Sequence, residues 1–112
     1  MYKCIIDAYQ KKIQTNDAFS LTIPAGTAVQ NARTSYLGDN LTVDGYHLND
    51  IGKVIATYTW YAALVGKPLQ EIHFEKIPGS ITIDENLKKV IIESVNNALA
   101  EPLQVTESAN KN

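Results

Sequence analysis

The sequence predicts the C-terminal part of an α/β domain that is rich in helices and has one clear strand. Residues 19–24 carry that strand pattern, and a single strand cannot form a stable sheet. Helical patterns surround it, as in the last third of a doubly wound α/β domain. The chain also opens directly in a helix, whereas a complete α/β enzyme normally opens with a strand. We therefore expect that the partner strands lie in a missing N-terminal half or in a second copy of the chain.

The composition is that of an ordinary globular protein. The chain has 112 residues, of which 45% are hydrophobic and 20% are charged, so it is one domain or part of one. Ten basic and twelve acidic residues give a net charge of −2, and Lys and Arg form no stripe, so we expect no nucleic-acid partner. No apolar run reaches the ~20 residues that span a bilayer, and no signal-peptide pattern opens the chain. Its localisation is therefore unknown from the sequence.

Local patterns place two helices and the strand in the first third of the chain. Apolar residues at helical spacing predict an amphipathic helix over residues 1–15. Residues 19–24 alternate between apolar and hydroxyl side chains and end in a proline, as in a short strand. Thr27 is then a suitable N-cap for a helix with an apolar side, formed by Ala28, Val29, Ala32 and Tyr36.

Two further helices follow, separated by less regular segments. Residues 37–49 have neither a helical nor a strand period and predict a loop. A wide apolar stripe predicts a helix over 51–65, capped by Asn49 or Asp50 and stopped at Gly66.

The last part of the chain begins with an irregular connector in which residues 72–74 predict a short extended piece. Thr82 and Glu85 match a capping box, which predicts a final helix that ends before Pro102. The tail over 104–112 is polar, and we expect it to be disordered.

The sharpest chemical signal is the run Asp44-Gly45-Tyr46-His47 in the predicted loop. Histidine is the usual general base near neutral pH, because its pKa of ~6.5 lets it accept and return a proton. A carboxylate that accepts a hydrogen bond from Nδ1–H fixes the tautomer and stabilises the imidazolium. Gly45 permits a tight turn, so we predict that the two side chains approach to ~2.6–3.2 Å. Taken alone, the pattern fits better a surface histidine beside a turn aspartate, because such tetrapeptides are common by chance.

The surroundings of this run carry a family resemblance. The run continues through Leu48-Asn49 to Gly52 and a helix with Trp60-Tyr61, and it is preceded by Ile23-Pro24-Ala25-Gly26-Thr27-Ala28 and Gln30-Asn31-Ala32-Arg33. This pattern resembles the last block of SGNH (GDSL-type) hydrolases, and it is most similar to a bacterial SGNH-like family of unknown function. The similarity covers residues 1–100, and its specific part covers 23–66.

The resemblance implies a three-layer α/β/α, flavodoxin-like fold and hydrolysis of acyl or acetyl esters on carbohydrates or lipids. Asp44 would be the orienting acid and His47 the general base. Residues 1–103 would form the partial hydrolase domain and 104–112 the polar tail. Full-length relatives of this kind are expected to be exported to the periplasm or secreted.

The chain departs from that pattern because it lacks the serine nucleophile and the oxyanion-hole residues. No Gly-Asp-Ser-type block precedes residue 23, and Gly38-Asp39-Asn40-Leu41 offers only an amide, which is no nucleophile. Ser35 is expected on the exposed end of a helix, and Cys4 is expected to be a small core residue. The other serines have no supporting context: Ser20, Ser80, Ser94 and Ser108.

Other uses of the polar and aromatic residues are weaker. The loop offers possible metal ligands, but their spacing fits neither an EF-hand nor a zinc motif, so we expect no metal and no cofactor: Asp39, Asp44, His47 and Asp50. His73 is interpreted as a polar residue of a half-buried strand. Five aromatic residues could line a sugar-binding surface, although core or anchor roles explain most of them better: Tyr36, Tyr46, Tyr58, Trp60 and Tyr61.

Two classes of function follow. The first is a C-terminal fragment of an SGNH-type ester hydrolase, which carries the acid–base block and would be inactive alone for want of a nucleophile. The second is a non-catalytic binding or assembly module on an SGNH-derived fold. In both cases the unpaired strand and the wide apolar faces predict self-association, unless a missing N-terminal half covers them.

Overall fold

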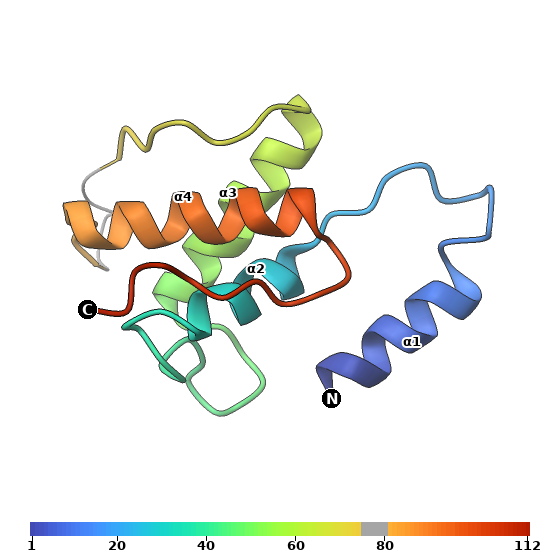
Figure 1. Ribbon diagram of the computed structural model, residues 1–112, viewed down its shortest axis with the longest axis horizontal. Helices are drawn as coiled ribbons and strands as arrows, with labels where there is room; N and C mark the ends of the chain where they lie inside the picture. The colour runs from blue at the N-terminus through green and yellow to red at the C-terminus, as the bar shows by residue number, and fades with distance from the viewer. Residues whose placement is uncertain (75–80) are drawn as a thin grey trace.

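The structure, a computed structural model, describes residues 1–74 and 81–112. The described chain is rich in helices (Figure 1), namely α1 (Tyr2–Lys12), α2 (Ala25–Arg33), α3 (Asp50–Val65) and α4 (Glu85–Ala100). Within the described ranges, Thr42 and Leu48 form an isolated antiparallel β-bridge.

Helices α2, α3 and α4 form the body of the molecule, and each packs against the other two. Their apolar faces meet in one core, in which Val90, Ile91 and Val95 of α4 are fully buried. Two alanines of α2, Ala28 and Ala32, are buried in this core. The fully buried aliphatic residues of this core are Ala28, Ala32, Ile55, Val90, Ile91, Val95 and Ala98.

Local signals set the ends of α3 as predicted. The Asn49 side chain accepts a hydrogen bond from the Gly52 N–H at 3.0 Å, which satisfies one of the unpaired donors of the first turn. At the other end Gly66 has a φ of +74° and its N–H donates to the Ala62 carbonyl at 2.9 Å. A left-handed glycine in this position is a common helix stop.

The caps of the other two body helices differ from the prediction. Helix α4 is capped by Asp84, whose carboxylate accepts from the Leu87 N–H at 2.8 Å, and not by Thr82. Asp is a preferred N-cap residue, and it directly precedes the helix. Helix α2 begins two residues before Thr27, because the Pro24 carbonyl already accepts from the Ala28 N–H at 3.0 Å.

The predicted strand over residues 19–24 is not formed in this chain. The segment lies outside any helix or strand, and Phe19 and Leu21 are 55% and 53% exposed. A strand exists only as part of a ladder, and no described residue pairs with this segment. Residues 72–74 are likewise irregular, with Ile72 buried and its neighbours exposed. The helix-rich part of the predicted fold class is therefore confirmed, whereas the strand is not.

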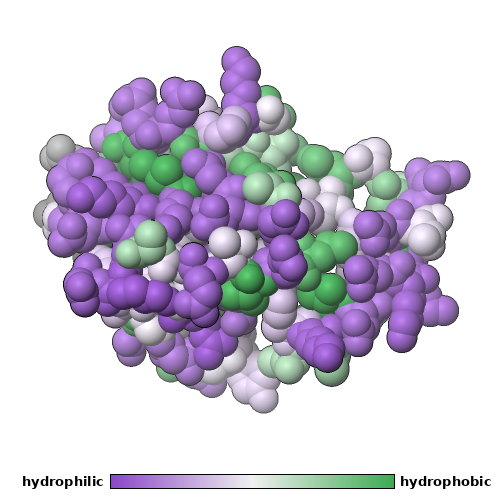
Figure 2. Space-filling view, in the orientation of Figure 1, coloured by the Kyte–Doolittle hydropathy of each residue, from purple (hydrophilic) through white to green (hydrophobic). Residues whose placement is uncertain are grey.

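Helix α1 lies apart from the body (Figure 1), and none of its residues is buried. The Tyr2 hydroxyl donates to the Thr27 hydroxyl at 2.8 Å, and Thr27 in turn donates to the Pro102 carbonyl at 2.7 Å. Figure 2 shows apolar surface in the region between the body and this N-terminal arm, residues 1–24. Cys4 is exposed on α1, so its predicted place in the core is wrong.

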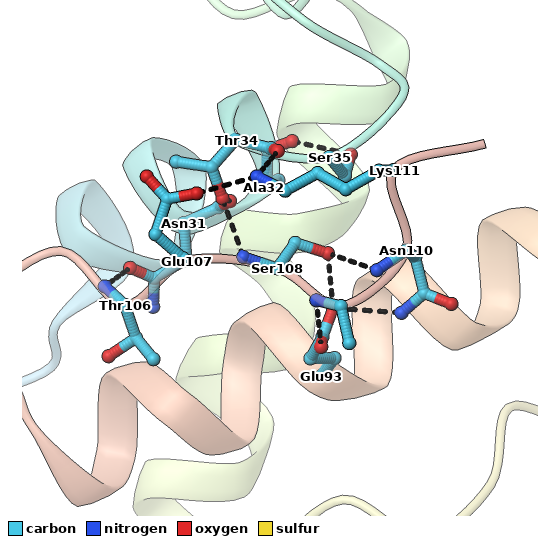
Figure 3. A network of polar contacts seen from close by, with 11 residues as sticks. Asn31, Ala32, Thr34, Ser35, Glu93, Thr106, Glu107, Ser108, Asn110 and Lys111 are labelled. Carbon is cyan, nitrogen blue, oxygen red and sulfur yellow. Dashed lines mark hydrogen bonds and ion pairs between the residues drawn. The ribbon is translucent and has the colours of Figure 1, made fainter.

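The C-terminal tail is ordered, in contrast to the predicted disorder (Figure 3). The Thr106 N–H donates to the Asn31 carboxamide oxygen at 2.7 Å, and the Ser108 N–H donates to the Thr34 hydroxyl at 2.8 Å. Both partners belong to the α2 region, far from the tail in sequence. The tail is therefore tied across the body as a strap.

Glu93 on α4 holds the second half of this strap (Figure 3). Its carboxylate accepts from the Ser108 hydroxyl, from the Ala109 N–H at 2.7 Å and from the Asn110 amide at 2.8 Å. Burial would raise the pKa of Glu93, but these donors and the nearby Lys111 ammonium outweigh it and lower the pKa below its usual value. The charged form of Glu93 thus stabilises the strap.

Candidate functional site

The predicted loop between α2 and α3 is a closed hairpin-like turn. The Val43 N–H donates to the His47 carbonyl at 2.9 Å, and the Asn49 N–H donates to the Leu41 carbonyl at 3.0 Å. Leu41 is 1% exposed and anchors the start of the loop in the core. Backbone pairing and one buried side chain therefore fix the base of the loop, while its tip faces solvent.

At the tip, the Asp44 carboxylate organises the turn. Its Oδ1 accepts from the Tyr46 N–H at 2.9 Å and from the His47 N–H at 2.7 Å. Gly45 has a φ of +85°, a conformation that is costly for residues with a side chain. Aspartate followed by glycine is a typical turn pair for these two reasons.

The same turn brings the two candidate side chains together. Asp44 Oδ2 lies 2.5 Å from His47 Nδ1, so the predicted contact is confirmed. Because an ionised carboxylate only accepts, Nδ1 must carry the proton, which leaves Nε2 of a neutral ring free to accept one. The side chains of His47 and Asp44 are 80% and 46% exposed, so the pair lies open on the surface.

Hydrogen bonds stabilise the charged form of Asp44. The backbone N–H of His47 is the main cause, followed by the His47 ring and the Tyr46 N–H, and together they lower the pKa of Asp44 below its usual value. The carboxylate therefore stays ionised throughout the range in which a histidine titrates, as an orienting acid requires.

Among the described residues, the structure places no serine as a partner for His47. Ser35 is buried and not exposed as predicted, and its hydroxyl donates to the Ala32 carbonyl at 2.6 Å and accepts from the Leu37 N–H at 3.2 Å. Ser94 is buried in α4, Ser108 binds Glu93, and Ser20 lies in the exposed arm. Ser80 lies outside the described residues.

The other candidate ligands of the loop do not converge. Asp39 pairs with Arg33 at 2.9 Å, and Asp50 lies 3.9 Å from Lys53. Among the described residues, no three His, Cys, Asp or Glu side chains gather as a metal site would need. His73 is exposed, and its Nε2 lies 3.2 Å from Glu71 Oε1. It therefore does not lie in a half-buried strand.

The aromatic candidates divide between core and surface. Tyr58 packs against the core, whereas Tyr36, Tyr46, Trp60 and Tyr61 are exposed. A groove of about 1000 Å³ runs along α3 and the segment 67–74, with an apolar wall that includes Tyr58, Tyr61, Leu69, Phe74 and Ile83. Neither member of the Asp44–His47 pair lines this groove.

Asn49 has a second role that was not predicted. Besides capping α3, its amide donates to the Asn40 carbonyl at 2.6 Å, across the base of the loop. The sequence offered only a weak hint, since Asn, Asp, Ser and Thr are all good caps but Asn alone of these also carries an amide donor.

The comparisons with known proteins bear on the whole chain. The profile of a domain of unknown function, DUF4886, matches residues 1–93. The chain belongs to the DUF4886 family. The crystal structure of a DUF4886 family protein from Bacteroides uniformis matches with 38% identity and a TM-score of 0.84. The match covers 99% of this chain but only 41% of that protein. No curated protein matches.

This DUF4886 chain thus shares its helix-rich fold with part of a protein that is more than twice as long, and it spans 41% of that relative. No helix of the described residues has both the length and the apolar character needed to cross a membrane.

Proposed function

We propose that this DUF4886 chain supplies the acid and base of an ester hydrolase of SGNH type, which removes acyl or acetyl groups from carbohydrates or lipids. The contact between Asp44 and His47 carries the proposal. It orients the ring through Nδ1 and leaves Nε2 to exchange a proton with a nucleophile, which is the arrangement that a hydrolytic triad uses.

In the proposed reaction, His47 Nε2 takes the proton of a serine hydroxyl as the serine oxygen attacks the ester carbonyl. The proton then passes to the leaving alcohol, and an acyl-serine remains. Water, deprotonated by the same nitrogen, attacks the acyl-serine; the bond between the acyl carbon and the serine oxygen breaks, the proton returns to the serine oxygen, and the carboxylic acid is released. Throughout the cycle Asp44 holds the ring and stabilises the imidazolium.

The nucleophile and the oxyanion donors belong, in this proposal, to the part of a longer protein that this chain does not contain. The length of the Bacteroides uniformis relative supports this division, as does the open position of the pair. A catalytic base works best in a site from which water is excluded, so a second body must cover His47. Residues of the described chain leave that side open.

The alternative proposal is a non-catalytic binding or assembly module, which the exposed apolar residues on the second half of α3 favour. Trp60, Leu64 and Val65 are 54%, 65% and 50% exposed, an unusual density for one face of a lone domain. Such a face fits a protein interface, and it needs no contribution from His47.

A chimera separates the two proposals. This chain would replace the matching portion of the Bacteroides uniformis protein, and hydrolysis of an aryl acetate would be compared with that of the isolated chain. We expect turnover by the chimera and negligible turnover by the isolated chain, because removing a triad member costs orders of magnitude in rate. His47→Ala and Asp44→Asn should abolish turnover in the chimera.

His73→Ala is the matched control, because His73 is the other histidine beside a carboxylate. Its turnover should equal that of the unchanged chimera. A folded chimera whose turnover survives His47→Ala, or a folded chimera without activity on acetyl, longer acyl and acetyl-sugar esters, would contradict the hydrolase proposal and favour the binding module.

A further inference from the structure

We propose that Asn49 is a positioning residue whose carboxamide locks the base of the loop and thereby fixes the geometry of the Asp44–His47 pair. This inference rests on the proposed function for its catalytic consequence, but the locked geometry can be tested without activity. Its starting point is the number of bonds that one residue makes at the point where the loop meets α3.

Three hydrogen bonds of Asn49 join the loop and the cap, in addition to the helical bond in which its carbonyl accepts from the Lys53 N–H at 2.8 Å. Its Oδ1 accepts from the Gly52 N–H at 3.0 Å, its Nδ2 donates to the Asn40 carbonyl at 2.6 Å, and its backbone N–H donates to the Leu41 carbonyl at 3.0 Å. The first bond ties Asn49 to the helix, and the other two tie it to the opposite end of the loop. The residue therefore joins three backbone segments.

Helix capping alone does not require an amide. In the same molecule Asp84 caps α4 with a carboxylate, which accepts from the Leu87 N–H at 2.8 Å and has no donor. The amide donor of Asn49 binds the loop instead, at the Asn40 carbonyl oxygen. A carboxylate in its place would face that oxygen with a second acceptor. The Asn49 side chain thus binds the base of the loop in addition to capping the helix.

Gly52 completes the lock by permitting close approach. A Cβ atom at this position would lie 2.6 Å from the Leu41 carbonyl oxygen and 3.0 Å from Leu48 Cδ2, which the backbone cannot accommodate without moving. The first turn of α3 is therefore pressed directly against both sides of the loop base. Any side chain here would push the two sides away from the helix.

The lock reaches His47 through consecutive backbone contacts. Above the Asn49–Leu41 bond, Thr42 bridges to Leu48, and the Val43 N–H then donates to the His47 carbonyl. The His47 N–H in turn donates to Asp44 at 2.7 Å. Because each contact restricts the next, loosening the base by a few tenths of an ångström changes where the exposed imidazole points.

The test uses NMR of the imidazole nitrogens in the isolated chain, at a pH where histidine is neutral. In the unchanged chain His47 should be mostly the Nδ1–H tautomer, because Asp44 accepts from that nitrogen. Asn49→Asp and Asn49→Ser both keep an acceptor for the cap; Asp has no donor for the Asn40 carbonyl, and Ser replaces the amide donor by a shorter hydroxyl. In both variants we expect His47 to become a mixture of tautomers, while the helical circular dichroism stays unchanged.

Asn40→Ala is the matched control, since within the described chain the amide of Asn40 donates to the nearby Leu37 carbonyl at 2.8 Å and the backbone carbonyl that Asn49 uses is kept. His73 is the internal control, and its tautomers should not change in any variant. An unchanged His47 tautomer in both Asn49 variants would overturn the inference. So would loss of helicity in both, because it would reduce Asn49 to a helix cap.

Activity in the chimera described above tests the catalytic consequence. Both Asn49 variants should lower kcat on the order of tenfold to a hundredfold and leave KM unchanged, because a base that is slightly displaced still permits substrate binding. An inactive parent chimera together with the expected NMR change would refute the proposed function and leave the positioning role intact. A mixture of His47 tautomers in the unchanged chain would refute the pairing itself, and both proposals with it.

Discussion

The three-helix body and the N-terminal arm show how little an amphipathic pattern says about the partner of a helix. Helices α2, α3 and α4 bury a common core, whereas α1 buries none of its residues, although its sequence pattern is just as helical. The arm also leaves Ile5, Phe19 and Leu21 more than half exposed. Burial on one side and exposure on the other indicate that the body is held by its own contacts, and we predict that the arm packs against a partner.

The largest expected effect is on the free energy of unfolding, and it is found by truncating one isoleucine in the body and one in the arm. Ile91→Ala on α4 should lower the free energy of unfolding by about 2–5 kcal/mol, because it leaves a cavity in a fully buried site. Ile5→Ala on α1 should change it by less than about 0.5 kcal/mol, because that side chain is 58% exposed.

Urea unfolding of the two variants and of the unchanged chain measures both values. Similar losses for the two isoleucines would break the distinction between body and arm, since they would show that α1 is buried in solution.

The next effect concerns the strap that closes the body. Glu93→Gln should lower the free energy of unfolding by about 1–3 kcal/mol, because three donors lose a charged acceptor. Glu107→Gln is the control in the same tail, since Glu107 is exposed and pairs only with Lys111 at 2.6 Å among the contacts described.

The direction in which the free energy of unfolding changes with pH follows from the lowered pKa of Glu93. Because the pKa of Glu93 is lowered in the folded chain, its stabilisation is complete above the unfolded value of about 4.3 and is lost as the pH falls through the folded value. Unfolding curves between pH 3 and pH 7 should therefore differ between the two variants at the upper end and converge at the lower end. A constant difference would contradict this role of the Glu93 charge.

The smallest effect on stability, but a measurable effect on self-association, is expected from residues 19–24 of the arm. Because this segment forms no ladder with the described residues and its large apolar side chains are exposed, we predict that the isolated chain self-associates at micromolar concentration. Phe19→Ser together with Leu21→Ser should shift sedimentation towards the monomer without loss of helicity. A monomeric unchanged chain would show that the arm needs no cover.

The comparison also explains what the sequence could and could not predict. The ends of α3 at Asn49 and Gly66 and the contact between Asp44 and His47 depend on residues within a few positions, so local patterns were sufficient. The strand over 19–24 failed because a ladder needs a partner that the local pattern does not contain. The ordered tail was missed because its anchor Asn31 lies 75 positions away from Thr106.

Function depends on the same distinction between local and distant partners. Asp44 finds His47 three residues away, and the turn residue Gly45 makes the contact nearly obligatory. A nucleophile, by contrast, comes from a distant segment in any triad, and the buried, paired hydroxyl of Ser35 shows that proximity in sequence is a poor guide to it. In our proposal, Asp44 and His47 supply the acid and base, and the longer protein supplies the rest of the site.

The most direct measurement of the central claim is covalent labelling of the chimera with a fluorophosphonate, followed by mass spectrometry of the modified peptide. An activated serine reacts with such a reagent only when its base is in place. We predict modification of one serine in the part contributed by the Bacteroides uniformis protein, and its loss on His47→Ala but not on His73→Ala. Modification that persists without His47, or that falls on a serine of the present chain, would contradict the assignment of Asp44 and His47 as the acid and base.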